Sequence, residues 1–136
     1  MHTSDPLSLS HVFYVSRSLA TPIEVDRILR CAREQNSHRG VTGSLLFTGG
    51  HFAQLLEGTP AAVADTMAII GADRRHTAVK RLAEGDLSQR RFGAWSMAFA
   101  EAPGADDLIE QLLSSAEVPP ERAQRLMRLM FETAPL

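Results

Sequence analysis

The sequence has little of several features that mark well-known classes of protein. It contains one cysteine, Cys31, so no disulfide can form within the chain, which fits a reducing compartment. Its longest apolar runs fall far short of the ~20 residues that span a bilayer. Met1 to Pro6 lack a basic start followed by an apolar run, so a secretory signal is not expected. These absences predict a cytoplasmic protein that does not interact with a membrane.

Charge of one sign is also scarce. The formal net charge is −2 over 136 residues, and there is no basic cluster or like-charge tail. Such a chain does not attract the phosphates of nucleic acids, so direct nucleic-acid binding is not expected. The run Arg90-Arg91-Phe92-Gly93 faintly resembles the aromatic strand of RNA-recognition domains, but it falls on the wrong strand for that role.

The sequence signatures of common catalytic sites are missing as well. The glycines Gly40, Gly43, Gly49 and Gly50 match neither of the phosphate-binding glycine fingerprints. None of the five histidines pairs with another histidine or with Cys31 at the spacing of zinc ligands, so no metal site is predicted. No serine has the sequence surroundings of an activated nucleophile. We therefore do not expect an enzyme.

What the chain does have is a hydrophobic content of 44%, enough to bury the core of one compact domain. Apolar periodicity and turn residues predict five strands, over residues 9–16, 41–48, 51–57, 77–82 and 94–100. Two helices are expected to start at Pro22 and Pro60, and two more to cover residues 105–115 and 120–132. In the first strand, Phe13 and Val15 point to one face and Val12 points to the other.

The order β-α-β-β-α-β-β predicts a ferredoxin-like α+β sandwich. Its sheet is mixed and mainly antiparallel, with two helices on one face. Leu126, Leu129 and Met130, with Phe131 beside them, form an apolar stripe on the last helix, which is expected to cover the other face. We therefore expect a domain over 1–102 and a helical extension, 103–136, packed on the sheet.

Three polar side chains are predicted to lie at positions that are usually apolar. Tyr14 is central in the first strand, and Gln54 lies between apolar residues on its own face of the third. Asn36 extends the apolar stripe of the first long helix. A buried amide without partners costs roughly 1–3 kcal/mol, so each side chain needs a hydrogen-bond partner. Together, a phenol and two amides on facing elements suit a flat heterocycle with polar edges.

Each of these residues, taken alone, also has a simpler structural explanation. A buried tyrosine bonds a nearby carbonyl, an asparagine at a helix end acts as a cap, and a glutamine in a strand lies at a sheet edge. Trp95 and Met97 are expected on the last strand, and their residue types alone favour core packing. The physical chemistry of the residues does not name a ligand.

Six segments, in order and at characteristic spacing between about Leu9 and Glu101, carry a family resemblance. They are Phe13-Tyr14-Val15-Ser16, Asn36, Gly40-Val41-Thr42-Gly43, Phe52-Ala53-Gln54-Leu55-Leu56-Glu57-Gly58, Asp73-Arg74-Arg75-His76 and Arg91-Phe92-Gly93-Ala94-Trp95-Ser96-Met97. On these motifs the chain resembles the BLUF family, the sensors of blue light using FAD. The match stops near Glu101, so the chain looks like a short, stand-alone member.

The resemblance implies that FAD binds non-covalently, with its isoalloxazine ring between the first two helices. Tyr14 and Gln54 match the family's photoactive tyrosine and glutamine, and Trp95 and Met97 fall in the segment that relays the signal. The residues matching the cofactor-binding set are Tyr14, Ile28, Asn36, Gln54, Asp73, Arg75 and His76. Ile69 is a departure, because some members contact the flavin from that position with a basic or polar side chain.

The mechanism implied by the resemblance is a photochemical switch. Blue light drives electron and proton transfer from Tyr14, and Gln54 returns with a changed hydrogen-bonding pattern. A homo-oligomer and an unidentified downstream effector protein are the expected partners, besides FAD. The rival hypothesis is a ferredoxin-like protein-protein interaction module that does not respond to light.

Overall fold

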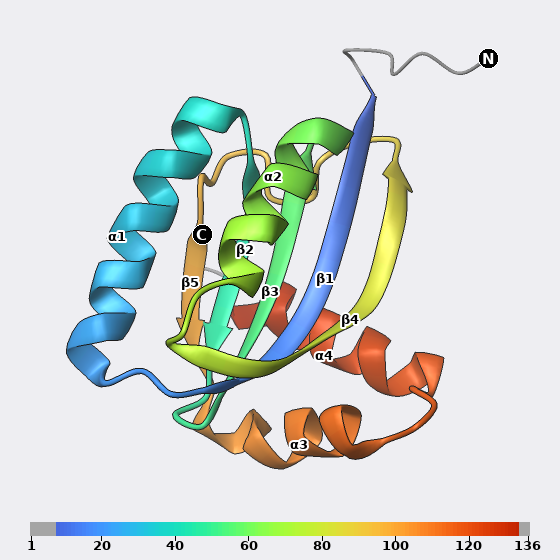
Figure 1. Cartoon of the computed structure of the whole chain (residues 1–136). Coiled ribbons are helices and arrows are strands. Elements are labelled where there is room, and N and C mark those ends of the chain that lie inside the picture. The colour runs from blue at the N-terminus through green and yellow to red at the C-terminus, as the bar shows by residue number, and fades with distance from the viewer. Residues whose placement is uncertain (1–7, 134–136) are drawn as a thin grey trace.

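The computed structural model describes residues 8–133, which form a five-stranded sheet with helices on both faces (Figure 1). The expectation about Met1 to Pro6, and the outer ends of the two expected segments 1–102 and 103–136, lie outside the described residues. Within 8–133, no helix is both long and apolar enough to cross a membrane. The elements in chain order are β1 (Leu9–Ser18), α1 (Pro22–Arg39), β2 (Thr42–Phe47), β3 (His51–Gly58), α2 (Pro60–Gly71), β4 (His76–Leu87), β5 (Ala98–Glu101), the 3-10 helix η1 (Pro103–Ala105), α3 (Asp106–Ser114) and α4 (Pro120–Thr133).

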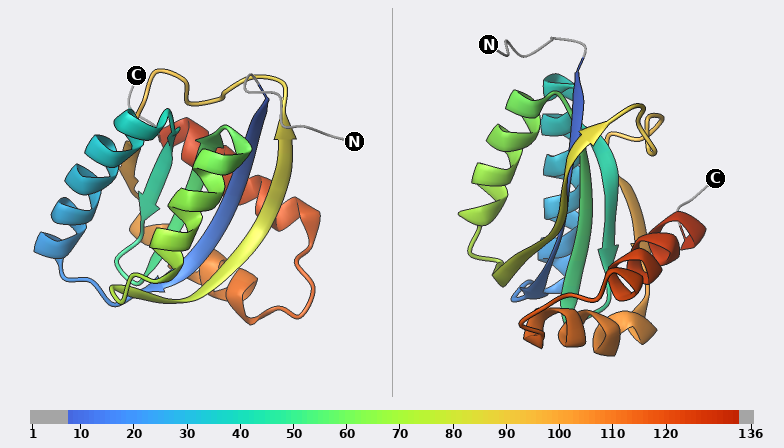
Figure 2. Two further views of the ribbon diagram at one scale, coloured as in Figure 1. Left: turned by 45° about the horizontal axis from the view of Figure 1, so that its top comes forward. Right: turned by 90° about the vertical axis from the view of Figure 1, so that its right-hand side faces the viewer.

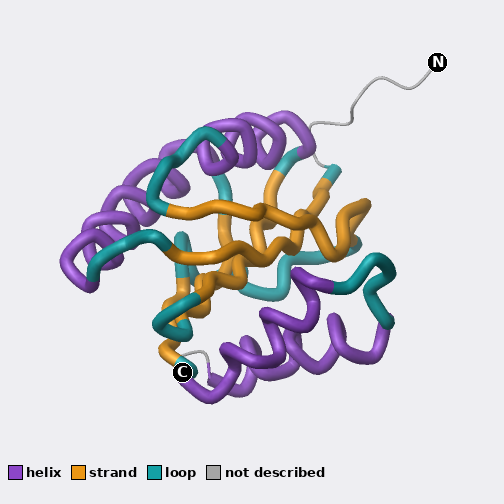
Figure 3. Tube along the Cα trace, turned by 60° about the horizontal axis from the view of Figure 1, so that its bottom comes forward, coloured by secondary structure: helices purple, strands orange, loops and turns teal. Residues whose placement is uncertain are grey.

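The strands lie in the order β4-β1-β3-β2-β5. All neighbours are antiparallel except β2 and β5, which are parallel. Helices α1 and α2 cover one face of the sheet, and α3 and α4 lie across the other, as Figure 2 (right) and Figure 3 show. The predicted ferredoxin-like α+β sandwich, with its mixed and mainly antiparallel sheet, is confirmed.

The side-chain alternation along β1 divides the interior into two cores. Phe13 and Val15 pack with apolar residues of α3 and α4, whereas Val12 packs with those of α1 and α2. β3 lies between β1 and β2 and is buried along its whole length. Each residue of β3 therefore faces one of the two cores, according to its parity in the strand.

Capping residues set the ends of the two long helices on the cavity side. Thr21 and Glu24 form a capping box at the start of α1, and Thr59 caps α2. Gly40 ends α1 in the left-handed conformation, with φ of 68°. Gly43 is required for a different reason, because a Cβ there would lie 1.9 Å from the backbone oxygen of Leu55.

Two strand boundaries differ from the sequence-based expectation. β4 runs to Leu87 because it stays paired with the start of β1 past an irregularity between Phe13 and Tyr14. β5 begins only at Ala98, so the prediction that Trp95 and Met97 lie on the last strand is wrong. The backbone oxygens of Ser96 and Met97 accept hydrogen bonds from side chains of α1, so they are not available for a strand ladder.

Helix α3 is held to the sheet at its N-terminal end by a polar cluster around His51. The ring Nδ1 lies 2.7 Å from Asp106 Oδ1 and Nε2 lies 2.6 Å from Glu110 Oε2. Arg17 donates to Glu110 over 2.5 Å, and the hydroxyl of Thr48 donates to Asp106. Residues from β1, from β3 and from the turn between β2 and β3 therefore bind α3 through the carboxylates of Asp106 and Glu110.

The other end of α3 is held by Lys80 of β4. Its ammonium group donates to the backbone oxygens of Leu112, over 2.6 Å, and Ser115, over 2.5 Å. The last carbonyls of a helix lack partners inside it and carry the negative end of the helix dipole, so a cation there is stabilising. Lys80 thus acts as a C-terminal cap supplied by a distant strand.

The buried contact of α4 with the sheet predicts a large stability effect at Leu126, which is fully buried. Leu126→Ala should lower the free energy of unfolding by about 2–5 kcal/mol, because it removes buried apolar contacts and leaves a cavity. Leu19→Ala is the matched control, since Leu19 is 63% exposed and its loss should change stability by under about 0.5 kcal/mol. Denaturant unfolding of both variants makes the comparison, and equal losses would contradict this packing.

The cluster around His51 predicts a specific response to acid. The hydrogen bond from Arg17, with a second from His51, lowers the pKa of Glu110 from 4.5 to about 2. Its stabilising contribution is therefore complete above pH 4.5 and is lost as the pH falls towards about 2. Glu110→Gln should lower the melting temperature near neutral pH, and the gap to the wild type should close on acidification. A difference in melting temperature that stays constant as the pH falls from neutral towards about 2 would contradict the stabilising role of the Glu110 carboxylate.

Candidate functional site

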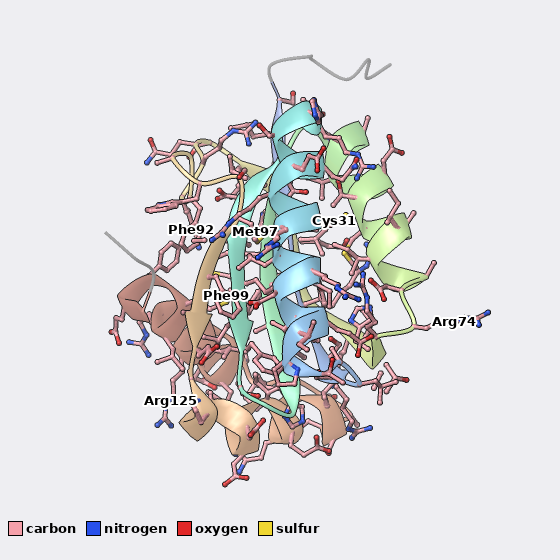
Figure 4. The ribbon with its side chains drawn as sticks, turned by 90° about the vertical axis from the view of Figure 1, so that its left-hand side faces the viewer. Cys31, Arg74, Phe92, Met97, Phe99 and Arg125 are labelled. Carbon is pink, nitrogen blue, oxygen red and sulfur yellow. The ribbon has the colours of Figure 1, made fainter. Side chains whose placement is uncertain are left out.

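A cavity opens between α1, α2 and the sheet, with about 1070 Å³ of empty space that includes its solvent-exposed mouth. Figure 4 shows Cys31 on the side of α1 that faces α2. Side chains from both helices, β1, β2, β3 and the segment after α2 line the cavity. They are Tyr14, Ile28, Cys31, Ala32, Gln35, Asn36, Arg39, Leu45, Phe52, Gln54, Thr66, Ile69, Ile70, Asp73, Arg75 and His76.

At the base of the cavity, the hydroxyl of Tyr14 donates to Oε1 of Gln54. The two residues are direct cross-strand partners in the β1–β3 ladder, so the sheet register places their side chains together on the cavity face. Gln54 is only 5% exposed, and its Nε2 lies 3.6 Å from Sδ of Met97. Gln54 is on an inner strand, so the explanation of a glutamine at a sheet edge does not apply. The carbonyl that the buried Tyr14 bonds is the one in the side chain of Gln54.

Tyr14 is the only tyrosine of the chain. Burial, with a smaller effect of the charge on Asp73, raises its pKa well above the usual value of 10.0. The phenol therefore keeps its proton at neutral pH and is the donor in the bond to Gln54. A neutral, buried phenol next to an amide can pass a proton along a hydrogen bond that already exists.

Asn36 lies near the end of α1 but does not cap the helix, since Gly40 occupies that position. Its buried side chain lines the cavity, and its Nδ2 donates to the backbone oxygen of Ser96 over 2.9 Å. Ile28, two turns earlier, lines the same cavity and supplies apolar surface. The helix stripe thus combines an apolar wall with one amide.

A charged pair and a histidine border the cavity beyond the end of α2. Arg75 donates to Asp73 through Nη2 over 2.7 Å, and this pairing lowers the pKa of Asp73. His76 Nε2 lies 2.6 Å from the backbone oxygen of Ile70, so that nitrogen carries the proton. Its Nδ1 lies 2.8 Å from the hydroxyl oxygen of Ser16. Arg74 of the same segment instead points away from the molecule in Figure 4.

All seven residues of the expected cofactor-binding set therefore line one cavity, but the two expected relay residues separate. Met97 is buried in the core on the α1–α2 side, whereas Trp95 packs against the core on the α3–α4 side. Ile69 lines the cavity with its side chain 55% exposed. The cavity combines broad apolar walls with amide, hydroxyl and charged groups, which fits a flat heterocycle with polar edges.

Sequence reasoning missed several lining residues. Cys31, Gln35 and Arg39 follow Ile28 along α1 at successive spacings of three, four and four residues, so helical periodicity alone could have found them. Thr66 of α2 and Leu45 of β2 carried no comparable signal. A threonine in a helix and a leucine in a strand are ordinary residues at their positions.

Comparison with known families identifies the class of this site. The profile of the family described as "Sensors of blue-light using FAD", the BLUF family, matches residues 9–98. That range contains every lining residue of the cavity. The chain belongs to the BLUF family, and it is a blue-light sensor that uses FAD.

Solved structures and curated relatives agree with this assignment. The dark-state structure of BlrB, a BLUF protein, has 32% sequence identity and a TM-score of 0.74, covering 89% of this chain and 93% of that one. The photo-activated state of BlsA has a TM-score of 0.77 over 94% of this chain and 99% of that one; at 20% identity it supports the fold alone. The "Photoactivated adenylate cyclase subunit beta" of Euglena gracilis is 29% identical over 79% of this chain, which spans only 13% of that relative's length.

The cavity predicts which of two residues, Asn36 or Trp95, matters more for holding the cofactor. Asn36→Ala should weaken flavin retention more than Trp95→Ala, because Asn36 lines the cavity and Trp95 packs on the other side of the sheet. The measurement is flavin occupancy of both purified variants after the same dialysis. Equal occupancy would count against a direct role for Asn36.

Proposed function

We propose that Tyr14 and Gln54 are the photoactive pair of this sensor, and that Ile28, Asn36, Asp73, Arg75 and His76 complete its flavin-binding set. The observation that carries the proposal is the buried hydrogen bond from the Tyr14 hydroxyl to Gln54 Oε1, at the base of the cavity. The bond joins a single-proton donor to a group that has both a donor end and an acceptor end.

Bound FAD would absorb blue light, and the excited state formed in this way would accept an electron. Tyr14 is the side chain placed to give up that electron, and its phenolic proton has a direct path to Gln54 Oε1. When electron and proton return to Tyr14, Gln54 is left rotated or tautomerised. No covalent bond to the protein forms in this cycle, so the dark state can recover on its own.

The change at Gln54 has an immediate neighbour in the protein. In the structure described here, Gln54 Nε2 is directed at Sδ of Met97. A rotated amide would direct its oxygen there instead, and sulfur is a poor partner for an oxygen acceptor. We infer that Met97 is the first residue to respond and that Trp95, two residues away on the other side of the sheet, carries the change to α3 and α4.

The same arrangement assigns different roles to the two parts of the chain. Residues 1–102 would form the photosensor, and 103–136 a helical extension that reads its state through the shared core. Within 8–133, this sensor fold and the helices α3 and α4 account for every element, so the described residues contain no separate catalytic domain. An effector protein and a homo-oligomer remain the expected partners, and α3 and α4 are the elements best placed to contact them.

The rival hypothesis, a ferredoxin-like interaction module without a light response, predicts a different phenotype for the Tyr14–Gln54 pair. In a photoswitch, Tyr14→Phe and Gln54→Leu should each leave a folded, yellow protein, since Asn36 and the apolar walls remain. Both should abolish the reversible red shift of flavin absorption, because each removes one partner of the proton path.

The measurement is a lit-minus-dark difference spectrum for the wild type and both variants. A normal red shift in either variant would assign the switch to other residues. A wild type that takes up FAD but shows no shift would favour the interaction module.

A further inference from the structure

The segment between β4 and β5 that carries Trp95 and Met97 has no regular secondary structure from residue 91 to 97. Its path is therefore set by individual hydrogen bonds to the rest of the fold. On the cavity side, Ser96 and Met97 accept from Asn36 and Arg33 of α1 through their backbone oxygens. The other end of the segment is held by a residue that belongs to no part of the cavity, Glu57.

Glu57 is three residues after Gln54 on β3, so its side chain leaves the opposite face of the strand. It is fully buried. Its Oε2 accepts from the backbone N–H of Arg91 over 2.6 Å, and its Oε1 accepts from the N–H of Phe92 over 2.9 Å. Thr42 of β2 donates its hydroxyl to the same Oε1 over 3.1 Å.

All three partners of this side chain are hydrogen-bond donors, two to Oε1 and one to Oε2, so the group acts only as an acceptor here. Two consecutive backbone N–H groups directed at one carboxylate fix the local chain direction as well as its position. Arg90 strengthens the same junction, since it donates to the backbone oxygens of Glu57, over 3.1 Å, and Gly40, over 2.8 Å.

Two further hydrogen bonds hold the backbone of Trp95, one to the anchored end and one to β2. The N–H of Trp95 donates to the backbone oxygen of Phe92 over 2.9 Å, which closes a turn directly after the anchor. The N–H of Gly43 then donates to the oxygen of Trp95 over 3.2 Å. Figure 4 shows Phe92 towards α4 and Met97 beside α1, at opposite ends of this short path. Phe92 also stacks on Phe131 of α4, with ring centroids 4.7 Å apart.

We propose that Glu57 is a positioning residue of the light switch: by holding the N–H groups of Arg91 and Phe92, it sets where Met97 meets Gln54 and where Trp95 packs. The inference rests on the proposed function, because it takes Gln54 as the switching group. Glu57 holds one end of the segment, and Gln54 contacts Met97 at the other end. Because Glu57 and Gln54 are both on β3, the two ends of the segment contact the same rigid strand. Light then moves Met97 relative to an anchor that stays in place.

The test is Glu57→Gln, which keeps the shape of the side chain but turns one oxygen into an NH₂ group. The amide oxygen should stay with its two donors, Phe92 and Thr42, which leaves the NH₂ facing the N–H of Arg91. Glu101→Gln is the matched control, because Glu101 is an exposed carboxylate at the end of β5. Both proteins are compared with the wild type as FAD-loaded full chains.

Three readouts are expected to change in Glu57→Gln and not in the control. Amide hydrogen exchange at Arg91 should become about tenfold faster in the dark, with a smaller change at Phe92. The fluorescence of Trp95, the only tryptophan, should shift to longer wavelength as its packing loosens. Dark recovery should slow by about threefold or more, because the loosened segment returns Met97 to Gln54 less often. Flavin content and the red shift itself should persist.

Unchanged amide hydrogen exchange at Arg91 would overturn the proposal that Glu57 anchors this segment. Exchange at Arg91 could instead become faster while the emission of Trp95 and the rate of dark recovery stay equal to those of the wild type. That result would show that Glu57 is merely structural, and it would overturn the positioning role. If Glu57→Gln does not fold, Thr42→Val removes one of the three donors at similar volume and should move the same readouts less. A wild type without a red shift would overturn the proposed function, and exchange and fluorescence would still decide on Glu57.

Discussion

A buried amide needs a donor for its oxygen and an acceptor for its NH₂ group, and in this fold both have to reach Gln54 in a nearly dry interior. Tyr14 meets the first need from the neighbouring strand and Met97 the second from an irregular segment. The second partner is much weaker, since a thioether is a poor acceptor. The two ends of the amide are therefore held unequally. The oxygen is held firmly by Tyr14, whereas the NH₂ group is held only weakly by Met97 and can exchange this partner for another.

β3 connects this amide to the rest of the molecule. One face of the strand presents Phe52 and Gln54 to the cavity, and the other presents His51 and Glu57 to the elements on the α3–α4 side. Because side chains of a strand alternate, the flavin site and the contacts to the C-terminal helices are interleaved along eight residues. A structural change at the flavin site therefore reaches the contacts with α3 and α4 through β3 itself, without another element in between.

Much of this could be predicted from the sequence. Alternation in β1 identified its two faces, and Pro22 and Pro60 marked the starts of both long helices. Tyr14, Asn36 and Gln54 stood out as polar residues at apolar positions. The late start of β5 could not be predicted, because residues 95–97 look like strand and are diverted by donors such as Asn36, 60 positions earlier in the chain. The partners of His51, 55 and 59 positions away, were equally invisible to any local pattern.

Helix α3 has a polar attachment at each end: carboxylates bound by His51 and Arg17 at the first turns, and carbonyls bound by Lys80 at the last. These attachments join α3 to three strands, β1, β3 and β4, through groups that lie off the helix axis. A displacement of these strands would therefore carry α3 with it as one body. Through the short connection to Pro120, α3 would pass that displacement on to α4.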